Sequence, residues 1–386
     1  MNKREEIQSL AKQAIIENNF NLIVDIAPRV GKSKILIDAI KDKEDWNICI
    51  SSPFQSIRNN WTKEAIKWNL GFDINSICSR SLNKIDSDLD LLVLDEIQTL
   101  STGQLETIIK KKPKRILGLT GTLADSTMLK LYQYLNIMPL FRYSIEQAIA
   151  DKIISNYHVY IILCDLDQVN RNVLAGPKDK QFYTTESMNY IFLSKKFEEY
   201  KEASLNDPKL ESIKMRYASL RTALLYGAKS KFLIAKKIVE MSQRCLIFTG
   251  LINTANQLSS HSHHSKNKKE KNLDKFIEEE INKLCVVEMV NMGITIPNLK
   301  TAIIHQLKSD PEMSWQKILR VCNLEDDKEA KIFITTYNNT VDLGWTMQAL
   351  KGIETDKVSF IQSEDFLRNG IKGKRLEKFN DLLKLQ

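Results

Sequence analysis

The sequence predicts an α/β fold of two domains, each with a mainly parallel sheet flanked by helices. Three observations lead to this prediction. Short apolar runs, typical of buried parallel strands, alternate with helix-length polar segments. The alternation occupies the first 150 residues and returns after residue 150. A chain of 386 residues is also long enough for two or three domains, at roughly 150 residues each.

The first predicted domain covers residues 1–150 and contains four apolar runs. The segment SIRNNWTKEAIKW, between two of these runs, has the length and polarity of a helix that covers a sheet. Strand and helix in alternation favour parallel strands, because the helix returns the chain to the end of the sheet at which the previous strand began. The predicted strands are LIVDI at 22–26, NICISS at 47–52, LLVLDE at 91–96 and RILGLTGT at 115–122.

The second predicted domain covers residues 151–350, and a basic C-terminal extension at 351–386 follows it. Residues from about 183 to 242 are rich in charge and contain no proline after Pro208, which favours a helical insertion. In the extension, apolar residues at helical spacing, such as Phe379, are expected to pack against the protein. The predicted strands are VYIILCDL at 159–166, RCLIFTG at 244–250, KLCVVEM at 283–289, KTAIIHQ at 300–306 and KIFITTY at 331–337.

Composition and charge exclude several classes of protein. With 13 Gly and 8 Pro the chain is not collagen-like or of low complexity, and no apolar run approaches the roughly 20 residues of a membrane helix. The N-terminal MNKREEIQSL has charges where a signal peptide has its apolar core. We therefore expect a cytoplasmic protein without a membrane partner, and the richness in Asn, Lys and Ile indicates a bacterial or phage-infected cell. The net charge of +8 allows a polyanionic partner.

Neither the cysteines nor the histidines predict a metal site. The six cysteines include no CxxC pair, and most lie in apolar runs, where a thiol is usually a small buried hydrophobe. His261, His263 and His264 resemble a metal-binding tract by composition, but no carboxylate lies at ligand spacing in their lysine-rich surroundings. We expect these histidines to lie in a polar loop.

The segment APRVGKS, between a predicted strand and a predicted helix, has the features of a phosphate-binding loop. Gly31 lets backbone N–H groups approach phosphate oxygens, and the helix N-terminus adds a field that favours anions. Lys32 is expected to reach the β- and γ-phosphates, and Ser33 to bind Mg²⁺. Ile26 stands where the usual G-x-x-x-x-G-K-S pattern has its first glycine. The predicted nucleotide-binding residues of this segment are Pro28, Arg29, Val30, Gly31, Lys32, Ser33 and Lys34.

Two carboxylates at the end of the third apolar run complete the predicted site. Asp95 follows Lys32 by 95 − 32 = 63 residues, and Glu96 comes directly after it. At the carboxyl end of a strand, Asp95 can hold Mg²⁺, and Glu96 can orient and deprotonate an attacking water. The phosphate loop and the carboxylate pair together predict Mg²⁺-dependent hydrolysis of a nucleoside triphosphate.

The order of these segments resembles the superfamily-2 helicases and translocases, above all the branch of type III restriction-subunit-like and phage recombination helicases. APRVGKS resembles motif I, and Asp95-Glu96-Ile97-Gln98 resembles motif II in its Asp-Glu-Ile-Gln variant. Five further segments match the family in order. They are SSPFQSIRNNW at 51–61 (motif Ia), LTGT at 119–122 (motif III), CLIFTG (motif IV), NMGITIP at 291–297 (motif V) and QKILR at 316–320 (motif VI).

The resemblance implies two tandem RecA-like domains with ATP and Mg²⁺ in the cleft between them. Gln316 and Arg320 would reach ATP from the second domain, where a guanidinium stabilises charge on the γ-phosphate. Gly293 of motif V would also lie at the nucleotide. Motif VI departs from the usual Gln-Arg-x-Gly-Arg-x-x-Arg pattern, and Lys317 stands where that pattern has its first arginine. This departure leaves open an ATP-gated binding clamp that hydrolyses ATP poorly.

The resemblance also implies a nucleic-acid partner, DNA more than RNA, in replication, recombination or repair. Strand contacts would be made mainly to phosphates, so we expect sequence-tolerant, salt-dependent binding. Besides a helicase or translocase and the clamp, the motor subunit of a restriction or recombination complex remains open. Near the N-terminus, Gln8 with Arg4 is predicted to read adenine, with Gln13 as the alternative. The predicted strand-binding residues are Ser52, Ser81, Thr120 and Thr122.

Overall fold

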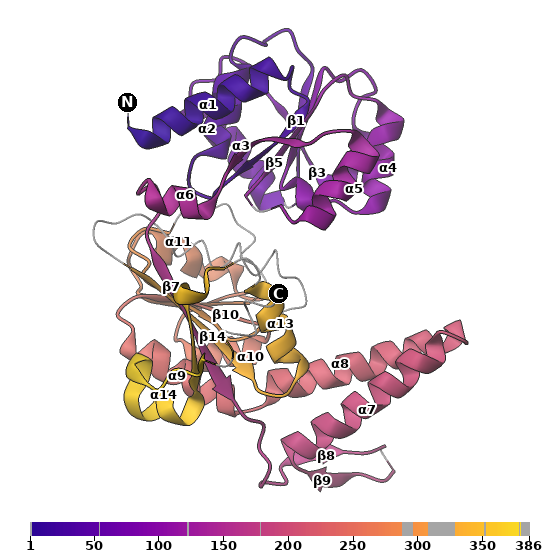
Figure 1. Ribbon diagram of the computed structural model, residues 1–386, viewed down its shortest axis with the longest axis vertical. Helices are drawn as coiled ribbons and strands as arrows, with labels where there is room; N and C mark the ends of the chain where they lie inside the picture. Colours follow the sequence, from indigo (N-terminus) through magenta and orange to yellow (C-terminus); the bar gives the residue numbers. More distant parts are fainter. Residues whose placement is uncertain are drawn as a thin grey trace. The chain divides into compact units, whose positions relative to one another are not determined.

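The computed structural model describes residues 2–53, 55–121, 123–177, 179–287, 296–307, 329–350, 353–377 and 379 (Figure 1). The chain divides into two units, one formed mainly by residues up to Asn156 and the other mainly by residues from Tyr157 onward. Each unit contains its own parallel sheet with flanking helices. The predicted fold class, α/β with two sheet-based domains, is therefore confirmed.

The first unit is built on a six-stranded sheet with the order β3-β2-β4-β5-β1-β6, in which every pair of neighbours is parallel. Four of its strands are the four apolar runs predicted from the sequence, and they occupy the centre of the sheet. The two edge strands, β3 and β6, are half exposed and were not predicted. The strands are β1 (Leu22–Ile26), β2 (Ile48–Ser52), β3 (Asn75–Cys78), β4 (Leu91–Asp95), β5 (Ile116–Thr120) and β6 (Pro139–Tyr143).

Helices cover both faces of this sheet, because alternate strand residues point to opposite sides. Leu22, Val24 and Ile26 of β1 join the core on one face, whereas Ile23 joins the core on the other. The first face packs against α1 (Lys3–Glu17), α2 (Lys32–Ile40), α3 (Gln55–Lys67) and α6 (Ile145–Ala150). The second face packs against α4 (Thr102–Lys111), α5 (Asp125–Leu135) and the 3₁₀ turn η1 (Ser79–Lys84).

The strand order brings the predicted chemistry to one edge of the first sheet. β5 lies between β4 and β1, so the carboxyl ends of these three strands are neighbours. β1 leads into the phosphate-loop segment, β5 ends at Thr120, and β4 ends at Asp95. In open parallel sheets, ligands bind outside the carboxyl ends of the strands. The fold therefore gathers these three segments where a ligand site is expected.

The second unit has a seven-stranded parallel sheet with the order β11-β12-β10-β13-β14-β7-β15. All five predicted strands are present. The sheet continues beyond residue 350, because β15 pairs with β7 and Phe379 stacks on Phe360 of β15. The strands are β7 (Tyr157–Cys164), β10 (Cys245–Thr249), β11 (Ser262–His263), β12 (Lys283–Val287), β13 (Thr301–Ile304), β14 (Ala330–Tyr337) and β15 (Val358–Gln362).

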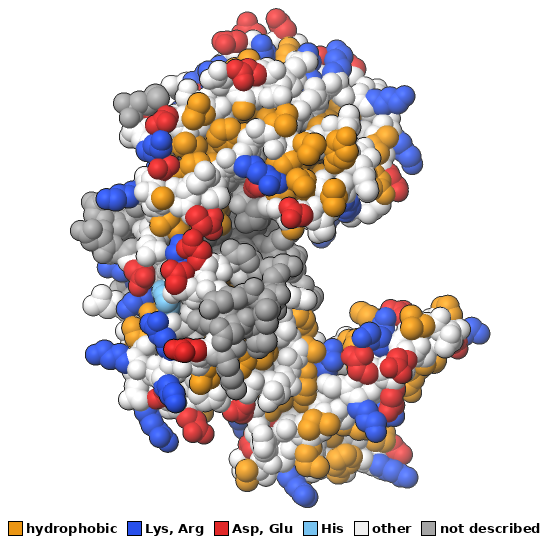
Figure 2. Space-filling view, viewed as in Figure 1, with side chains coloured by type: hydrophobic (Ala, Val, Ile, Leu, Met, Phe, Trp, Pro, Cys, Tyr) orange, Lys and Arg blue, Asp and Glu red, His pale blue; other side chains and the backbone are white. Residues whose placement is uncertain are grey.

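Three long helices occupy the region predicted as a helical insertion. They are α7 (Glu186–Ser204), α8 (Glu211–Gly227) and α9 (Ser230–Met241). α7 and α8 run side by side and project away from the sheet of the second unit (Figure 1). Hydrophobic side chains gather near the start of α7 and the small hairpin of β8 (Val173–Ala175) and β9 (Phe182–Thr184) (Figure 2). The exposed ones are Leu174, Phe182, Tyr183, Met188, Ile191 and Phe192.

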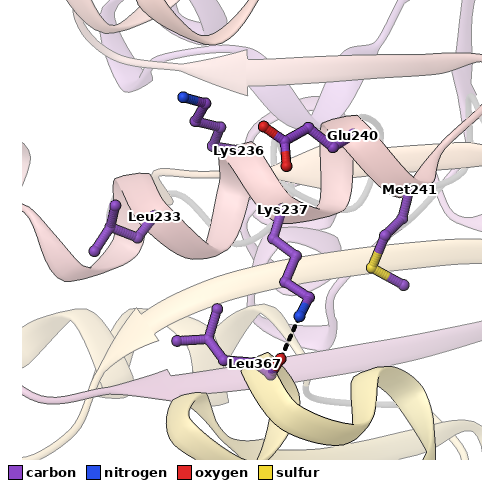
Figure 3. A pocket seen from close by; sticks show the side chains of 6 residues that line it. All are labelled: Leu233, Lys236, Lys237, Glu240, Met241 and Leu367. Carbon is purple, nitrogen blue, oxygen red and sulfur yellow. Dashed lines mark hydrogen bonds between the residues drawn. The ribbon is translucent and has the colours of Figure 1, made fainter.

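A shallow groove on the second unit lies between α9 and α14 (Ser363–Asn369) (Figure 3). Lys237 reaches across it and donates a hydrogen bond to the carbonyl oxygen of Leu367. The groove contains none of the predicted site residues. Its lining residues are Leu233, Lys236, Lys237, Glu240, Met241 and Leu367.

The expectation of a polar loop around the histidines was wrong in part. His263 belongs to the short strand β11, which pairs with β12, and His263 and His264 are both buried. Within the described residues, no group of three or more potential metal ligands is found. Four cysteines in this part of the chain are buried, and Cys78 is partly exposed. No helix among the described residues is long and apolar enough to cross a membrane.

A buried ion pair joins α9 and α13 (Val341–Ala349) to the end of β14. The Lys231 Nζ lies 2.5 Å from the Asp342 Oδ2, and both side chains are almost completely buried. The backbone N–H of Tyr337 donates to the same carboxylate oxygen at 2.9 Å. Nearby, burial and the Lys231 cation lower the pKa of His305 to about 3, so this imidazole is neutral at physiological pH.

Replacing Asp342 by asparagine is expected to lower the free energy of unfolding by about 3–5 kcal/mol, because the Lys231 charge would stay buried without its anion. Urea denaturation at neutral pH measures the change. A double variant, Lys231→Met with Asp342→Leu, removes both charges and should be clearly more stable than the single variant. A single-variant loss below about 1 kcal/mol, the range of exposed pairs, would contradict a buried pair.

Candidate functional site

The phosphate-loop segment has the backbone of an anion-binding loop. Gly31 has φ +110°, a left-handed conformation that favours glycine. A Cβ at this position would lie 2.7 Å from the Gln8 Nε2, so a side chain there would collide with Gln8. α2 begins at the next residue, and no side chain caps its N-terminus. Its first N–H groups are therefore available to an anion. Arg29 also adopts a left-handed conformation, with φ +73°, which is uncommon for a residue with a side chain.

Gln8 contacts this loop directly. Its Nε2 donates to the backbone carbonyl of Val30 at 2.6 Å, and its side chain is buried. Arg4, its predicted companion, donates to the carbonyl of Ile153 at 3.1 Å. Gln13, the alternative to Gln8, forms its hydrogen bond with Glu17 on the exposed side of α1. Of the two glutamines, the structure places Gln8 at the phosphate loop.

We expect Gln8→Ala to raise the dissociation constant for ATP about five- to tenfold, because the loop carbonyl would lose a buried hydrogen bond. Gln13→Ala is the matched control, since it removes a glutamine of the same helix whose hydrogen bond lies away from the loop. Binding of a fluorescent ATP analogue measures both variants. Equal weakening by the two substitutions would show that the contact with Val30 is unimportant.

Lys32 and Glu96 meet in front of the sheet. The Lys32 Nζ lies 3.2 Å from the Glu96 Oε1, and Gln98 donates to the Glu96 Oε2 at 2.9 Å. Glu96 has φ +52°, so the chain turns sharply just after β4. Burial opposes the charge on Lys32, but the carboxylates of Glu96 and Asp95 outweigh it and raise the pKa of Lys32. Lys32 is therefore a fixed cation beside two carboxylates.

Asp95 is the buried carboxylate of this cluster. It is 8% exposed, and Trp61 of α3 donates its indole N–H to the Asp95 Oδ2 at 3.0 Å. Burial first, and then the negative charge of Glu96, raise the pKa of Asp95 to about 6. The opposing effects of Lys32 and of the Trp61 hydrogen bond are smaller. The anionic form of such a carboxylate is stabilised by any cation that binds beside it.

The residues around Asp95 fit a magnesium ion. Mg²⁺ is a hard cation that is usually bound through one or two carboxylates together with phosphate oxygens and water. The Asp95 carboxylate and the hydroxyl-bearing Ser33 offer oxygen ligands of this type. A divalent cation would also offset the repulsion between Asp95 and Glu96, which helps to raise the pKa of Asp95. The donor set and its electrostatics therefore suit the predicted metal.

A third carboxylate and a small residue complete the surroundings of Lys32. Burial raises the pKa of Asp25, against the lowering effects of Arg142 and Lys32, and the Arg142 Nε lies 3.8 Å from the Asp25 carboxylate. A Cβ on Gly121 would lie 3.5 Å from the Lys32 Nζ and 3.4 Å from Pro28. The segment after β5 therefore passes within van der Waals contact of the phosphate loop.

Two of the predicted strand-binding residues lie at the end of β2 and beside it. Ser52 is the last residue of β2 and pairs in register with Cys78, which leads directly into η1 and Ser81. The Ser52 hydroxyl is buried and has no hydrogen-bond partner among the described residues. Such a hydroxyl is costly to bury unless a ligand or water pairs with it. Thr120 is buried at the end of β5.

The structure thus brings together the predicted nucleotide and metal residues of the first unit. Lys34 lies in the first turn of the same helix and pairs with Asp38 at 2.7 Å. Trp61, Gln98 and Asp25 belong to the site but were not predicted. Each had a sequence signal: Gln98 and Trp61 lie in the segments that resemble motifs II and Ia, and Asp25 interrupts the apolar run LIVDI. The predicted residues Thr122, Gly293, Gln316 and Arg320 lie outside the described residues.

Comparison with known proteins finds one matching family model and several similar structures. Residues 216–325 match the family of the helicase conserved C-terminal domain. The chain is similar to S. cerevisiae Dbp5 bound to RNA and ADP BeF3, with TM-score 0.59, 13% identity and coverage of 98% of this chain and 92% of that chain. It is also similar to the ATP-dependent Type ISP restriction-modification enzyme LlaBIII bound to DNA, with TM-score 0.60, 13% identity and coverage of 94% and 31%.

No curated protein sequence matches the chain significantly. At 13% identity, the structural likenesses establish the fold alone. That fold is two tandem RecA-like domains, each a parallel sheet flanked by helices, as the sequence predicted.

Proposed function

We propose that the protein is a superfamily-2 nucleic-acid motor, a helicase or translocase that hydrolyses ATP with Mg²⁺. The contact between Lys32 and Glu96, directly beside the buried Asp95, carries this proposal. A cation, a metal-binding carboxylate and a candidate base at one loop are the groups that phosphoryl transfer to water requires. The match of residues 216–325 to the helicase conserved C-terminal domain supports the same reaction.

Each residue of the cluster has a role in this proposal. The uncapped N-terminus of α2 and the Lys32 ammonium bind the phosphates, and Lys32 leaves Glu96 to do so. Asp95 and Ser33 would hold Mg²⁺, which would supply positive charge for the phosphate oxygens. Glu96, which Gln98 orients, positions the attacking water and accepts its proton. Gln316 and Arg320 are proposed to complete the site from the second domain, and Gly293 to lie at the nucleotide.

We propose DNA as the nucleic-acid partner, in replication, recombination or repair, because the sequence resembles restriction and recombination helicases. The unpartnered hydroxyl of Ser52 and the neighbouring Ser81 are the proposed phosphate contacts. Thr120 is proposed to connect these contacts with the nucleotide, because β5 lies between β1, which leads into the phosphate loop, and β4, which ends at Asp95. Phosphate contacts of this kind predict binding that weakens steeply with salt.

Two observations favour second candidates. Lys317 in motif VI lacks the planar fork of arginine, which favours an ATP-gated clamp with weak turnover. The match to LlaBIII covers only 31% of that enzyme, which favours a role as the motor part of a larger restriction or recombination complex. A fast ATPase rate would exclude the ATP-gated clamp. Full activity of the isolated chain would argue against a role as the motor part of a larger complex.

The decisive experiment is an ATPase assay of the purified chain with single-stranded DNA, duplex DNA, forked DNA and RNA in parallel. We expect Mg²⁺-dependent hydrolysis that DNA stimulates more than RNA does. Stimulation of hydrolysis by RNA alone would identify RNA, and not DNA, as the nucleic-acid partner. Tight binding of polynucleotide with no hydrolysis under any condition would overturn the motor and leave the clamp.

A further inference from the structure

Trp61 is the residue outside the predicted site that touches its metal-binding carboxylate. We propose that Trp61 is a positioning residue that fixes Asp95 for Mg²⁺ and links nucleic-acid binding at the end of β2 to the metal. The proposal rests on the proposed function, because it deepens the regulation of the same site. Nothing in the phosphate-loop or carboxylate sequence patterns assigns this role to Trp61.

The hydrogen bond from Trp61 has the geometry needed to hold the Asp95 carboxylate in one orientation. The indole Nε1 donates to the Asp95 Oδ2 at 3.0 Å, and Trp61 is 4% exposed. The Trp61 ring belongs to the core between the helices and the sheet, so packing fixes its orientation. A carboxylate that ligates a metal is generally held by hydrogen bonds from such neighbours, and their loss typically lowers metal affinity about 10- to 100-fold.

The position of α3 gives this contact a second consequence. β2 ends at Ser52, and α3 begins at Gln55, so the segment that carries Trp61 begins beside the proposed phosphate contact. The Ser52 hydroxyl, which is buried without a hydrogen-bond partner among the described residues, is the contact that we propose for a strand phosphate. Trp61 lies within that helix, so one element joins the proposed phosphate contact to the residue that holds Asp95. Nucleic acid bound there is therefore expected to strengthen the hold on Asp95 and to increase Mg²⁺ affinity.

The test compares two tryptophans of one segment. Trp61→Phe removes the N–H that Asp95 accepts and keeps an aromatic ring. Trp68→Phe is the matched control, because the Trp68 indole donates to the Glu64 carboxylate at 2.9 Å and not to Asp95. Phenylalanine also keeps the aromatic ring at position 68, whose centroid in the wild type lies 5.4 Å from the Lys34 Nζ. Mg²⁺ is titrated into each variant with a fluorescent ADP analogue, and binding of the analogue is also measured with EDTA. We expect Trp61→Phe to raise the half-saturating Mg²⁺ concentration about tenfold or more, with binding in EDTA unchanged.

Two further measurements separate positioning from a general structural role. In the background of Asp95→Asn, which removes the ligand that Trp61 holds, Trp61→Phe should change the affinity for the analogue by less than about twofold at fixed Mg²⁺. Single-stranded DNA should lower the half-saturating Mg²⁺ concentration of the wild type but have less effect on Trp61→Phe. If Trp61→Phe does not fold, the benzothienyl analogue of tryptophan at position 61 keeps the shape and lacks the N–H donor.

The possible failures are distinguishable. A wild type that binds no nucleotide and shows no Mg²⁺ effect overturns the proposed function itself. A wild type that responds to Mg²⁺, with Trp61→Phe indistinguishable from Trp68→Phe, overturns the role of Trp61 alone. Loss of binding in EDTA as large as the loss in Mg²⁺ would also overturn it, because packing and not the carboxylate would then be the cause.

Discussion

Replacing Lys32 by alanine is expected to lower the nucleic-acid-stimulated ATPase rate about 100-fold or more. The Lys32 ammonium is held at the phosphate loop by Glu96 at 3.2 Å, and the neighbouring carboxylates raise its pKa, so it stays charged throughout the physiological range. A fixed cation in a partly buried site stabilises charge that develops on phosphate far better than water does. Alanine offers no charge, and it leaves Glu96 and Asp95 facing each other.

Lys41→Ala is the matched control for this prediction. Lys41 directly follows the same helix, and it forms an exposed ion pair with Asp38 at 3.2 Å, away from the carboxylates at the loop. The steady-state ATPase rate with saturating DNA measures both variants, and circular dichroism checks that each is folded. A Lys32→Ala variant that kept more than about a tenth of the wild-type rate would contradict the assignment of Lys32 to the phosphates.

The strands at the centre of each sheet could be predicted from the sequence because both of their faces are buried. A run such as LLVLDE shows this directly, since every residue of β4 (Leu91–Asp95) is buried. Two edge strands that were not predicted lack this signal. β6 (Pro139–Tyr143) begins with a proline and alternates in burial, and β11 (Ser262–His263) is only two residues long and lies in lysine-rich sequence.

The site shows a similar division between local and long-range signals. Lys32, Asp95 and Glu96 could be predicted because each lies at or after the end of a recognisable strand, and parallel strands bring their carboxyl ends to one edge. The contact of Trp61 with Asp95 depends on how α3 packs on the sheet, so no local sequence pattern predicts this contact. The choice between Gln8 and Gln13, which the sequence analysis left open, could have been made from the sequence.

The helix that carries the two glutamines shows why. Ile7, Ala11 and Ile15 of α1 are buried at helical spacing, and Gln8 lies next to that stripe. Gln13 lies outside the stripe and is partnered with an exposed glutamate. The periodicity of α1 therefore already favoured Gln8 as the glutamine that faces the protein.

Replacing Asp95 by asparagine is expected to have two opposite effects: loss of Mg²⁺-dependent hydrolysis by about 100-fold or more, and a gain in stability of the ligand-free protein. Burial and the neighbouring Glu96 raise the pKa of Asp95 to about 6, above the 3.8 of a free aspartate. As the pH rises from about 4 to about 6, the unfolded chain therefore releases this proton first, and the free energy of unfolding falls.

Above pH 6 the full penalty is present, about 2–3 kcal/mol at 1.4 kcal/mol per pKa unit. Asparagine carries no charge, so Asp95→Asn should be more stable than the wild type by that amount at pH 8, and equally stable below pH 4. Asp38→Asn is the control of opposite sign, because hydrogen bonds from Lys34 and Lys41 outweigh burial and lower the pKa of Asp38. Asp38→Asn should therefore not raise the free energy of unfolding at pH 8.

Urea denaturation without Mg²⁺ at several pH values measures both variants. Stabilisation that appears only as the pH rises through the range from 4 to 6 would show that the site holds Asp95 as an anion against its environment. Such an arrangement is expected where a metal ion is to bind, since Mg²⁺ then supplies the missing positive charge. If Asp95→Asn is no more stable at pH 8 than at pH 4, relative to the wild type, the carboxylate is not under strain, and its selection as the metal ligand loses its electrostatic basis.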